Sequence, residues 1–356
     1  MCALFVSAAF LNQKFDQRER EIARDWYARG DADLAAGRAE DALDPLRTAL
    51  VYSRNRPEYE LRLGQALAAA QHYAEAQTYL LTLRERQPGS AALNLELARL
   101  AARRGDVSDA IHYYEASLYG VWESDGEQQR RAARLELIRY LGSHGHPAEA
   151  VAHTMSFAAN LPPDPALHIQ AGDLFMQEAS YDHAAEQFRQ VLLLEPHNAA
   201  ALSGAGRAAF KSGDYAGAVR YLERAARLTP GDAALAEMLA VTKSALSIDP
   251  DAPGLSAEVR GARALHAFSL AQSRIEACPP PKDKEAAAAL SALFGRAKLL
   301  EPKLHKNKLL RDVDLYTATR DFALDAEMAA ASACGPGSVD DRALALLAAR
   351  RHGGVR

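Results

Sequence analysis

The chain has 356 residues, which is too long for one compact core and long enough for an array of repeats with a second region. Hydrophobic residues make up 49% of it, which excludes a disordered chain, and 7% aromatic residues beside abundant alanine and leucine favour an all-helical fold. The 42 basic and 46 acidic residues give a net charge of -4, which excludes a general attraction to nucleic acid or to an anionic membrane.

The N-terminal segment, residues 1–22, begins with an apolar, uncharged run at residues 2–11 and continues as a charged amphipathic stretch. Such a run is too short for a membrane span, which needs about 20 residues, and it lacks the basic start of a signal peptide. Two interpretations stay open. The run is either the apolar start of a first helix packed on the end of the array, or the last part of a membrane anchor whose upstream part is absent from this chain.

Residues 165–198 and 199–232 are two copies of one module. Equivalent residues stand 34 positions apart, namely Gly172 and Gly206, Tyr181 and Tyr215, Ala184 and Ala218, Phe188 and Leu222, and Pro196 and Pro230. A fixed period of this length predicts stacked helix–turn–helix units that bury their apolar faces against one another. Residues 232–247 read as one further helix that caps the stack.

The same phase extends upstream, with modules that start at residues 23, 57, 91 and 131. Forty residues separate the last two starts, so six residues are inserted around residues 119–130. Small residues recur at positions 8 and 20 of each module, where two helices must approach closely, and a bulky residue recurs at position 24. Ile138 replaces the small residue at position 8 of the fourth module, and Trp122 replaces the usual proline in the third. We therefore expect a local distortion at this junction.

This pattern resembles the tetratricopeptide repeat family over residues 23–247. The resemblance implies an all-α, right-handed α-solenoid, in which the first helix of each module lines a concave groove that holds a peptide. Positions 9 and 13 of the modules usually point into that groove, and here they carry the candidate peptide-binding residues Gln65, Arg99, Arg103, Arg139, Asp173, Arg207 and Lys211. Arg99, Arg103 and Arg139 lie among leucines, which suits an acidic and apolar segment of a protein partner. The alternative for each residue is an exposed, solvated charge.

Motifs for catalysis are absent from the sequence, which has no G-x-S-x-G, no phosphate-binding glycine-rich loop and no H-E-x-x-H. The histidines at 144, 146 and 153 form the one histidine cluster, and a polar turn between helices is the better interpretation than a metal site. We therefore expect no catalytic residue, no metal and no cofactor, no nucleic-acid partner, and contact with a membrane only through the N-terminal segment.

The C-terminal region, residues 255–356, follows a turn-rich linker and leaves the 34-residue phase. Helical patterns cover residues 255–277, 284–300, 310–331 and 339–351. Cys278 and Cys334 each stand at the end of such a helix, before proline or glycine, where adjacent helices can bring them within disulfide reach. Two unrelated buried thiols are the alternative. A disulfide would stabilise a small helical bundle and would indicate an oxidising compartment.

Together these features predict a non-enzymatic scaffold that binds protein segments and assembles or positions a complex of the bacterial cell envelope. We expect it on the periplasmic side, with a possible inner-membrane anchor, and the cytoplasm is the alternative location. The alternative function is a non-catalytic regulatory or substrate-presenting subunit of an envelope enzyme. A catalytic C-terminal region is disfavoured because no cluster of titratable residues converges there in the sequence.

Overall fold

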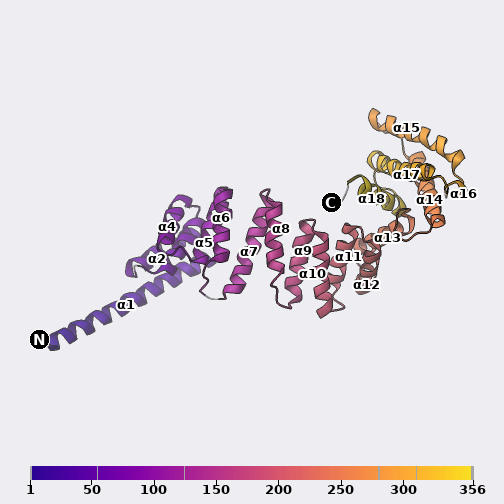
Figure 1. Cartoon of the computed structure of the whole chain (residues 1–356). Helices are drawn as coiled ribbons and strands as arrows, with labels where there is room; N and C mark the ends of the chain where they lie inside the picture. The colour runs from indigo at the N-terminus through magenta and orange to yellow at the C-terminus, as the bar shows by residue number, and fades with distance from the viewer. Residues whose placement is uncertain (1, 54, 124, 280, 310, 354–356) are drawn as a thin grey trace. The chain divides into compact units, whose positions relative to one another are not determined.

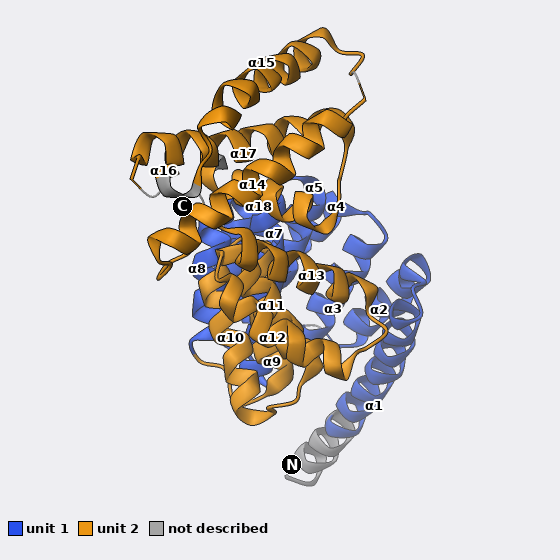
Figure 2. Ribbon diagram, turned by 90° about the vertical axis from the view of Figure 1, so that its right-hand side faces the viewer, with its two compact units in different colours: residues 1–159 blue, residues 160–356 orange. Residues whose placement is uncertain are grey.

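The computed structural model describes the backbone of residues 2–53, 55–123, 125–279, 281–309 and 311–353, and the side chains of residues 13–351 within these ranges except 306 and 307. The apolar run at residues 2–11 lies within a helix, but its side chains are outside the described residues, so both interpretations of it stay open. No helix in the described part of the chain is long and apolar enough to cross a membrane. Two compact units, residues 1–159 and 160–356, make up the chain (Figure 2).

The first unit is a stack of helix–turn–helix pairs (Figure 1). Its helices are α1 (Cys2–Ala35), α2 (Ala39–Tyr52), α3 (Pro57–Ala69), α4 (Tyr73–Arg86), α5 (Ala91–Arg104), α6 (Val107–Tyr119), α7 (Gly126–Ser143) and α8 (Pro147–Ala158). Each helix packs on the next one along the chain, and α3 also contacts α1 and α5. Successive first helices of the modules therefore lie side by side on one face of this unit.

The second unit begins with the two matching modules. It consists of α9 (Pro165–Gln177), α10 (Tyr181–Leu194), α11 (Ala199–Ser212), α12 (Tyr215–Leu228), α13 (Ala233–Ile248), α14 (Ala257–Ala277), α15 (Lys284–Leu300), a 3-10 turn η1 (Glu301–Lys303), α16 (Lys306–Leu309), α17 (Val313–Cys334) and α18 (Val339–Gly353). Helices α3, α5, α9 and α11 begin at the module starts expected from the period.

Local chemistry explains these boundaries. Proline stands at the first position of α3, α8 and α9, where its missing N–H costs no helical hydrogen bond. Asn198 and Asp232 accept hydrogen bonds from the backbone N–H groups of Ala201 and Leu235, each at 2.9 Å, and so cap α11 and α13. Gly213 ends α11 with a φ of 85°, a left-handed conformation that glycine adopts without a steric penalty.

The small residue at position 8 of a module receives the bulky side chain at position 24. A β-carbon added to Gly172 would lie 2.8 Å from the ring of Phe188, and one added to Gly206 would lie 2.6 Å from Leu222. Phe188 also lies against Gly204 of the following module, where an added β-carbon would meet the ring at 2.5 Å. The glycines therefore make room for the aromatic ring that joins two modules.

The fourth module reverses this arrangement of sizes. Ile138 occupies the glycine position, Thr154 occupies the bulky position, and both side chains are buried. The hydroxyl of Thr154 donates to the carbonyl of Ala150 at 3.0 Å, which satisfies it in the apolar surroundings. Helices α7 and α8 are continuous through these residues, so the expected distortion does not interrupt either helix.

The six-residue insertion folds back onto the start of its own module. The N–H of Val121 donates to the carbonyl of Gly89 at 2.8 Å, and the N–H of Ala91 donates to the carbonyl of Val121 at 3.0 Å. This bridge is the one strand-type pairing among the described residues. Gly120 permits it, because a β-carbon there would lie 2.9 Å from the backbone of both Gly89 and Ala91.

The C-terminal helices share one core with the last repeat. Tyr215, Ala245 and Ile248 from the repeat region are buried in the same cluster as Phe268 and Phe322, whose rings lie 4.7 Å apart. Helices α14 and α17 pack along each other, and a disulfide joins their ends at Cys278 and Cys334, with a Cα–Cα distance of 5.8 Å. Helix α13 therefore does not end the stack with a polar face, because the C-terminal helices cover it.

Candidate functional site

The face formed by the first helices of the first unit carries most of the predicted binding residues, and several of them bind each other. Arg62 of α3 forms an ion pair with Asp31 of α1 at 2.5 Å and donates to the side-chain oxygen of Gln65 at 2.8 Å. Gln65 is thus part of a bridge between neighbouring modules. The exposed members of such a bridge contribute little stability, about 0–1 kcal/mol for a surface pair.

Arg99 is the centre of a tighter network. Its Nε donates to Glu136 Oε2 at 2.9 Å, its Nη2 donates to Glu136 Oε1 at 2.5 Å, and its Nη1 donates to Glu96 Oε1 at 2.6 Å. Glu96 lies one turn earlier on α5, and Glu136 comes from α7. Hydrogen bonding to Glu136 raises the pKa of Arg99 further above its ordinary value. Arg99 therefore links the third and fourth modules, and the carboxylates of Glu96 and Glu136 already neutralise its charge.

Arg103 and Arg139 remain as free cations on this face. Both side chains are exposed, and neither forms a hydrogen bond or ion pair with another described residue. Arg103 lies one turn beyond Arg99 on α5, and Arg139 lies one turn beyond the half-buried Leu135 on α7. Because the bond from Arg99 to Glu136 holds α5 against α7, the two free arginines project from adjacent helices.

A pocket opens at the other end of the same helices. It has a volume of about 220 Å³, and its lining combines Leu61, Leu83, Leu93 and Val121 with polar side chains that include Glu58 and Glu123. Val121 reaches it because the insertion folds back beside the start of α5. Leu95 of α5 is only 7% exposed and belongs to the core.

In the second unit, Asp173 of α9 and Arg207 of α11 form an exposed ion pair at 3.6 Å. Lys211, one turn further along α11, is exposed and forms no such pair with any described residue. It lies at a pocket of about 250 Å³ where α11 approaches α18. Of the predicted residues, then, Arg103, Arg139 and Lys211 have unneutralised side chains, whereas Arg99, Asp173 and Arg207 bind carboxylates or cations within the fold.

The histidine cluster is a set of separate local contacts. The ring of His144 stacks on Tyr140 with centroids 4.0 Å apart, and its Nδ1 lies 2.8 Å from the carbonyl of Tyr140. His146 pairs with Glu149 at 3.1 Å, and burial lowers the pKa of His153. Among the described side chains, no group of three histidines, cysteines or carboxylates is arranged to hold a metal ion.

The C-terminal region contains a buried ionisable cluster that the sequence did not predict. Glu327 is 1% exposed, and the Nε of Arg274 lies 3.9 Å from one oxygen of Glu327 and 3.9 Å from one oxygen of Asp341. Burial first, and then the charge of Asp341, raise the pKa of Glu327 to about 7. Arg274 also donates to the carbonyl of Gly335 at 2.5 Å, beside the disulfide. Arg274, Glu327 and Asp341 come from α14, α17 and α18, so this cluster ties the three helices together within the core.

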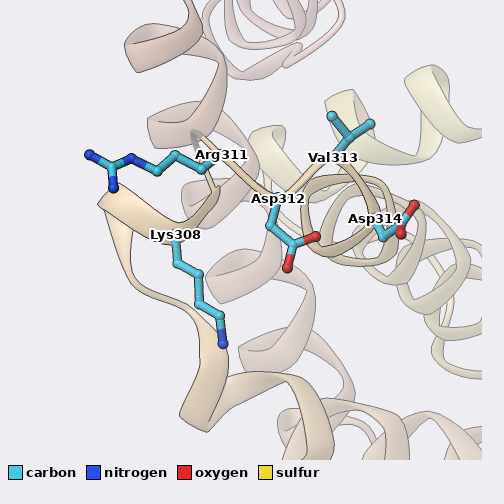
Figure 3. A pocket seen from close by; sticks show the side chains of 5 residues that line it. All are labelled: Lys308, Arg311, Asp312, Val313 and Asp314. Carbon is cyan, nitrogen blue, oxygen red and sulfur yellow. The ribbon is translucent and has the colours of Figure 1, made fainter.

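An open pocket of about 640 Å³ lies at the turn before α17 (Figure 3). The side chains of Lys308, Arg311 and Asp314 point in different directions rather than toward a common centre. Asp312 is occupied as the cap of α17, where it accepts the N–H of Leu315 at 2.9 Å. The pocket is therefore an open depression without converging groups.

Stacked helix–turn–helix pairs with an exposed first-helix face define the class of α-solenoid repeat proteins. Residues 61–125 and 169–233 match the family model described as the tetratricopeptide repeat. These two segments of the chain are tetratricopeptide repeats, an architecture suited to a scaffold for protein–protein interaction.

Solved structures with a similar chain fold are distant in sequence. PilF of Pseudomonas aeruginosa is 18% identical, with a TM-score of 0.41, over 62% of this chain and 98% of that chain. The C-terminal part of a repeat protein from Cytophaga hutchinsonii is 16% identical, with a TM-score of 0.46, over 68% of this chain and 95% of that one. PilW, described as a widely conserved type IV pilus biogenesis factor, is 16% identical, with a TM-score of 0.40, over 61% and 98%. No curated protein matches the chain significantly.

Proposed function

We propose that the protein is a non-catalytic scaffold that binds an acidic and apolar segment of a partner protein on the first-helix face of its first unit. The observation that carries the proposal is the pair of exposed arginines on adjacent helices, Arg103 and Arg139, which form no ion pair with a described residue and lie on the same face as the pocket that Leu61 lines. Carboxylates of the segment bind the two guanidinium groups, and an apolar side chain enters the pocket.

Arg99 is excluded from direct recognition in this proposal. Two carboxylates of the protein already occupy its guanidinium group, and a partner would have to displace them. The binding residues of the first unit are therefore Arg103 and Arg139, supported by Leu61 and Leu135. Asp173 and Arg207 neutralise each other in the second unit, whereas Lys211 forms no ion pair with a described residue.

The proposal is tested by affinity capture with the full chain and with the double variant Arg103→Ala/Arg139→Ala, followed by measurement of the dissociation constant for the captured partner. We expect the double variant to bind roughly tenfold or more weakly, which corresponds to about 1.4 kcal/mol. Arg20→Ala/Arg24→Ala is the matched control, because these two arginines of α1 are also exposed and unpaired among the described residues. Equal affinity of the two double variants would contradict the proposed binding face.

We further propose that the protein works in an oxidising compartment, on the periplasmic side of a bacterial envelope. The disulfide between Cys278 and Cys334 supports this location, because reducing compartments keep such thiols free. Fusion of a reporter enzyme that folds only with its own disulfides tests the location in cells. Activity of the fusion supports the periplasm, and an inactive but intact fusion supports the cytoplasm.

A further inference from the structure

Helix α18 covers the face of α13 that continues the first-helix face of the repeats. Helix α13 begins at Ala233, 34 residues after the start of α11 at Ala199, and so takes the place of the first helix of another module. Ser244 of α13 donates to Asp340 Oδ1 at 2.6 Å, and Arg342 of α18 forms an ion pair with Glu237 of α13. The protein's own C-terminal helix therefore occupies the position that a partner helix or segment would take over α13.

A pocket remains where the covered part of this face meets the uncovered part. It has a volume of about 250 Å³ and lies between the C-terminal end of α11 and the last turns of α18. Its apolar lining comes from Tyr181, Phe210 and Tyr215 of the repeats and from Leu346 of α18. Tyr215 is 5% exposed, so its ring belongs to the wall of the pocket, whereas Phe210 and Leu346 are half-buried and accessible.

Two cations, Lys211 and Arg350, stand at this pocket, and neither forms an ion pair with a described carboxylate. Lys211 is exposed and forms no ion pair with a described residue. The exposed Arg350 donates to the carbonyl of Gly213 at 3.3 Å, and its guanidinium carbon lies 5.7 Å from the centroid of the Tyr215 ring. Asp249 feels the charge of Arg350 but forms no ion pair with it, and instead accepts the N–H of Asp251 at 2.8 Å. Backbone and ring contacts therefore orient Arg350, and its guanidinium group forms no ion pair with a described carboxylate.

We propose that this pocket binds a partner segment in which an acidic side chain stands next to an aromatic or large aliphatic one. The carboxylate pairs with Lys211 and Arg350, and the apolar side chain packs against Phe210 and Leu346. The inference rests on the proposed scaffold function and adds a second contact point to it, built jointly by a repeat and the C-terminal region. A segment that lies along α9 and α11 reaches this pocket and goes no further, because α18 covers α13.

We assign a partner segment with a carboxylate beside an apolar side chain because the pocket offers a matching group for each of the two. Three aromatic rings and a leucine make most of the pocket's lining apolar, and they suit an apolar side chain. Two positive charges that form no ion pair with a described carboxylate favour a carboxylate over a lysine or arginine in the neighbouring position.

The test is a selection of random peptides displayed on phage against the full-length protein, repeated against Lys211→Glu/Arg350→Glu and against Ala349→Trp. Ala349 is exposed and lines the pocket, so a tryptophan there fills it without changing its charge. Arg220→Glu/Arg260→Glu is the control with the same change of charge, because both arginines are exposed in this unit and neither lines the pocket. Circular dichroism of every variant verifies that the helices are retained.

We expect the wild-type protein to enrich peptides with an acidic residue beside an aromatic or aliphatic one. Their dissociation constants should rise roughly tenfold or more in the charge-reversed pocket variant and in Ala349→Trp, and stay within about twofold in the control. Enriched peptides that bind all variants equally overturn this pocket but leave the scaffold function standing. If the wild-type protein enriches no peptide, both the pocket and the proposed function fall.

Discussion

Replacement of Arg99 by alanine separates the structural role of the first-helix face from its role in recognition. The change removes three charge-assisted hydrogen bonds, two to Glu136 and one to Glu96. It leaves the carboxylate of Glu96, whose side chain is 11% exposed, without its cation. The carboxylate of Glu136 stands nearby and becomes a like-charged neighbour instead of a second ligand of the same guanidinium group.

The loss in the free energy of unfolding caused by Arg99→Ala lies between two limits. Loss of one partner from a fully buried ion pair costs about 3–5 kcal/mol, and loss of an exposed pair costs about 0–1 kcal/mol. The Arg99 side chain is 35% exposed, and the two carboxylates are 11% and 29% exposed, so solvent screens part of the penalty. We expect Arg99→Ala to lower the free energy of unfolding by about 2 kcal/mol. Glu96→Gln and Glu136→Gln in the same chain should restore most of it, because they remove the unpaired charges.

Urea unfolding followed by circular dichroism measures this loss, and hydrogen exchange of the α5 and α7 amides locates it, since repeat arrays can unfold in parts. The double variant Arg103→Ala/Arg139→Ala is the control, with an expected change within about 0.5 kcal/mol for exposed residues without partners. A loss below about 0.5 kcal/mol in Arg99→Ala would refute the structural role of this network. An equally large loss in the variant that also carries Glu96→Gln and Glu136→Gln would refute it as well.

Three further changes test the packing and chemistry of the two units. Thr154→Leu should overpack the module in which Ile138 already fills the glycine position and cost about 1–3 kcal/mol in urea unfolding, and Ile138→Ala in the same chain should recover most of it. Reduction of the Cys278–Cys334 bridge, which spans 56 residues of sequence, should cost about 3–4 kcal/mol in melts with and without reductant, and free alkylatable thiols at both positions would contradict the bridge. In the folded protein the pKa of Glu327 is raised from 4.5 to about 7. The free energy of unfolding should therefore fall by up to about 3 kcal/mol as the pH rises from about 4.5 to 7. Glu327→Gln should remove this pH dependence in unfolding curves measured across the same range.

The repeat period predicted the helices well because the local signals agree with it. Proline begins α3 and α9, and an asparagine caps α11, so three first helices start where the 34-residue phase places them. The helices of the C-terminal region also follow their sequence patterns, with α14 and α15 ending at residues 277 and 300 as expected.

The 34-residue period does not predict which residues the charged side chains of the groove bind. Position 9 of a module indicates which side chain faces the groove, but not whether a neighbouring helix neutralises it. Arg99 meets Glu136 across a six-residue insertion, and the bond from Val121 to Gly89 that sets the path of this insertion has no sequence signature. In the same way, no repeat relates α18 to α13, so the contact between Asp340 and Ser244 follows from tertiary packing alone.

In the fourth module, the larger side chain, Ile138, stands at position 8 and the smaller one, Thr154, at position 24. This reversed order limits how recombination can rearrange the chain. In the modules with Gly172 and Gly206, a crossover within the turn between helices would join one small residue to another module's large one and keep the fit. A crossover between α7 and α8 would instead join Ile138 to a bulky residue, or Thr154 to a glycine, and leave either a clash or a cavity. The fit between Ile138 and Thr154 is therefore kept only when α7 and α8 are exchanged together, whereas the helices of the modules with Gly172 and Gly206 can be exchanged singly.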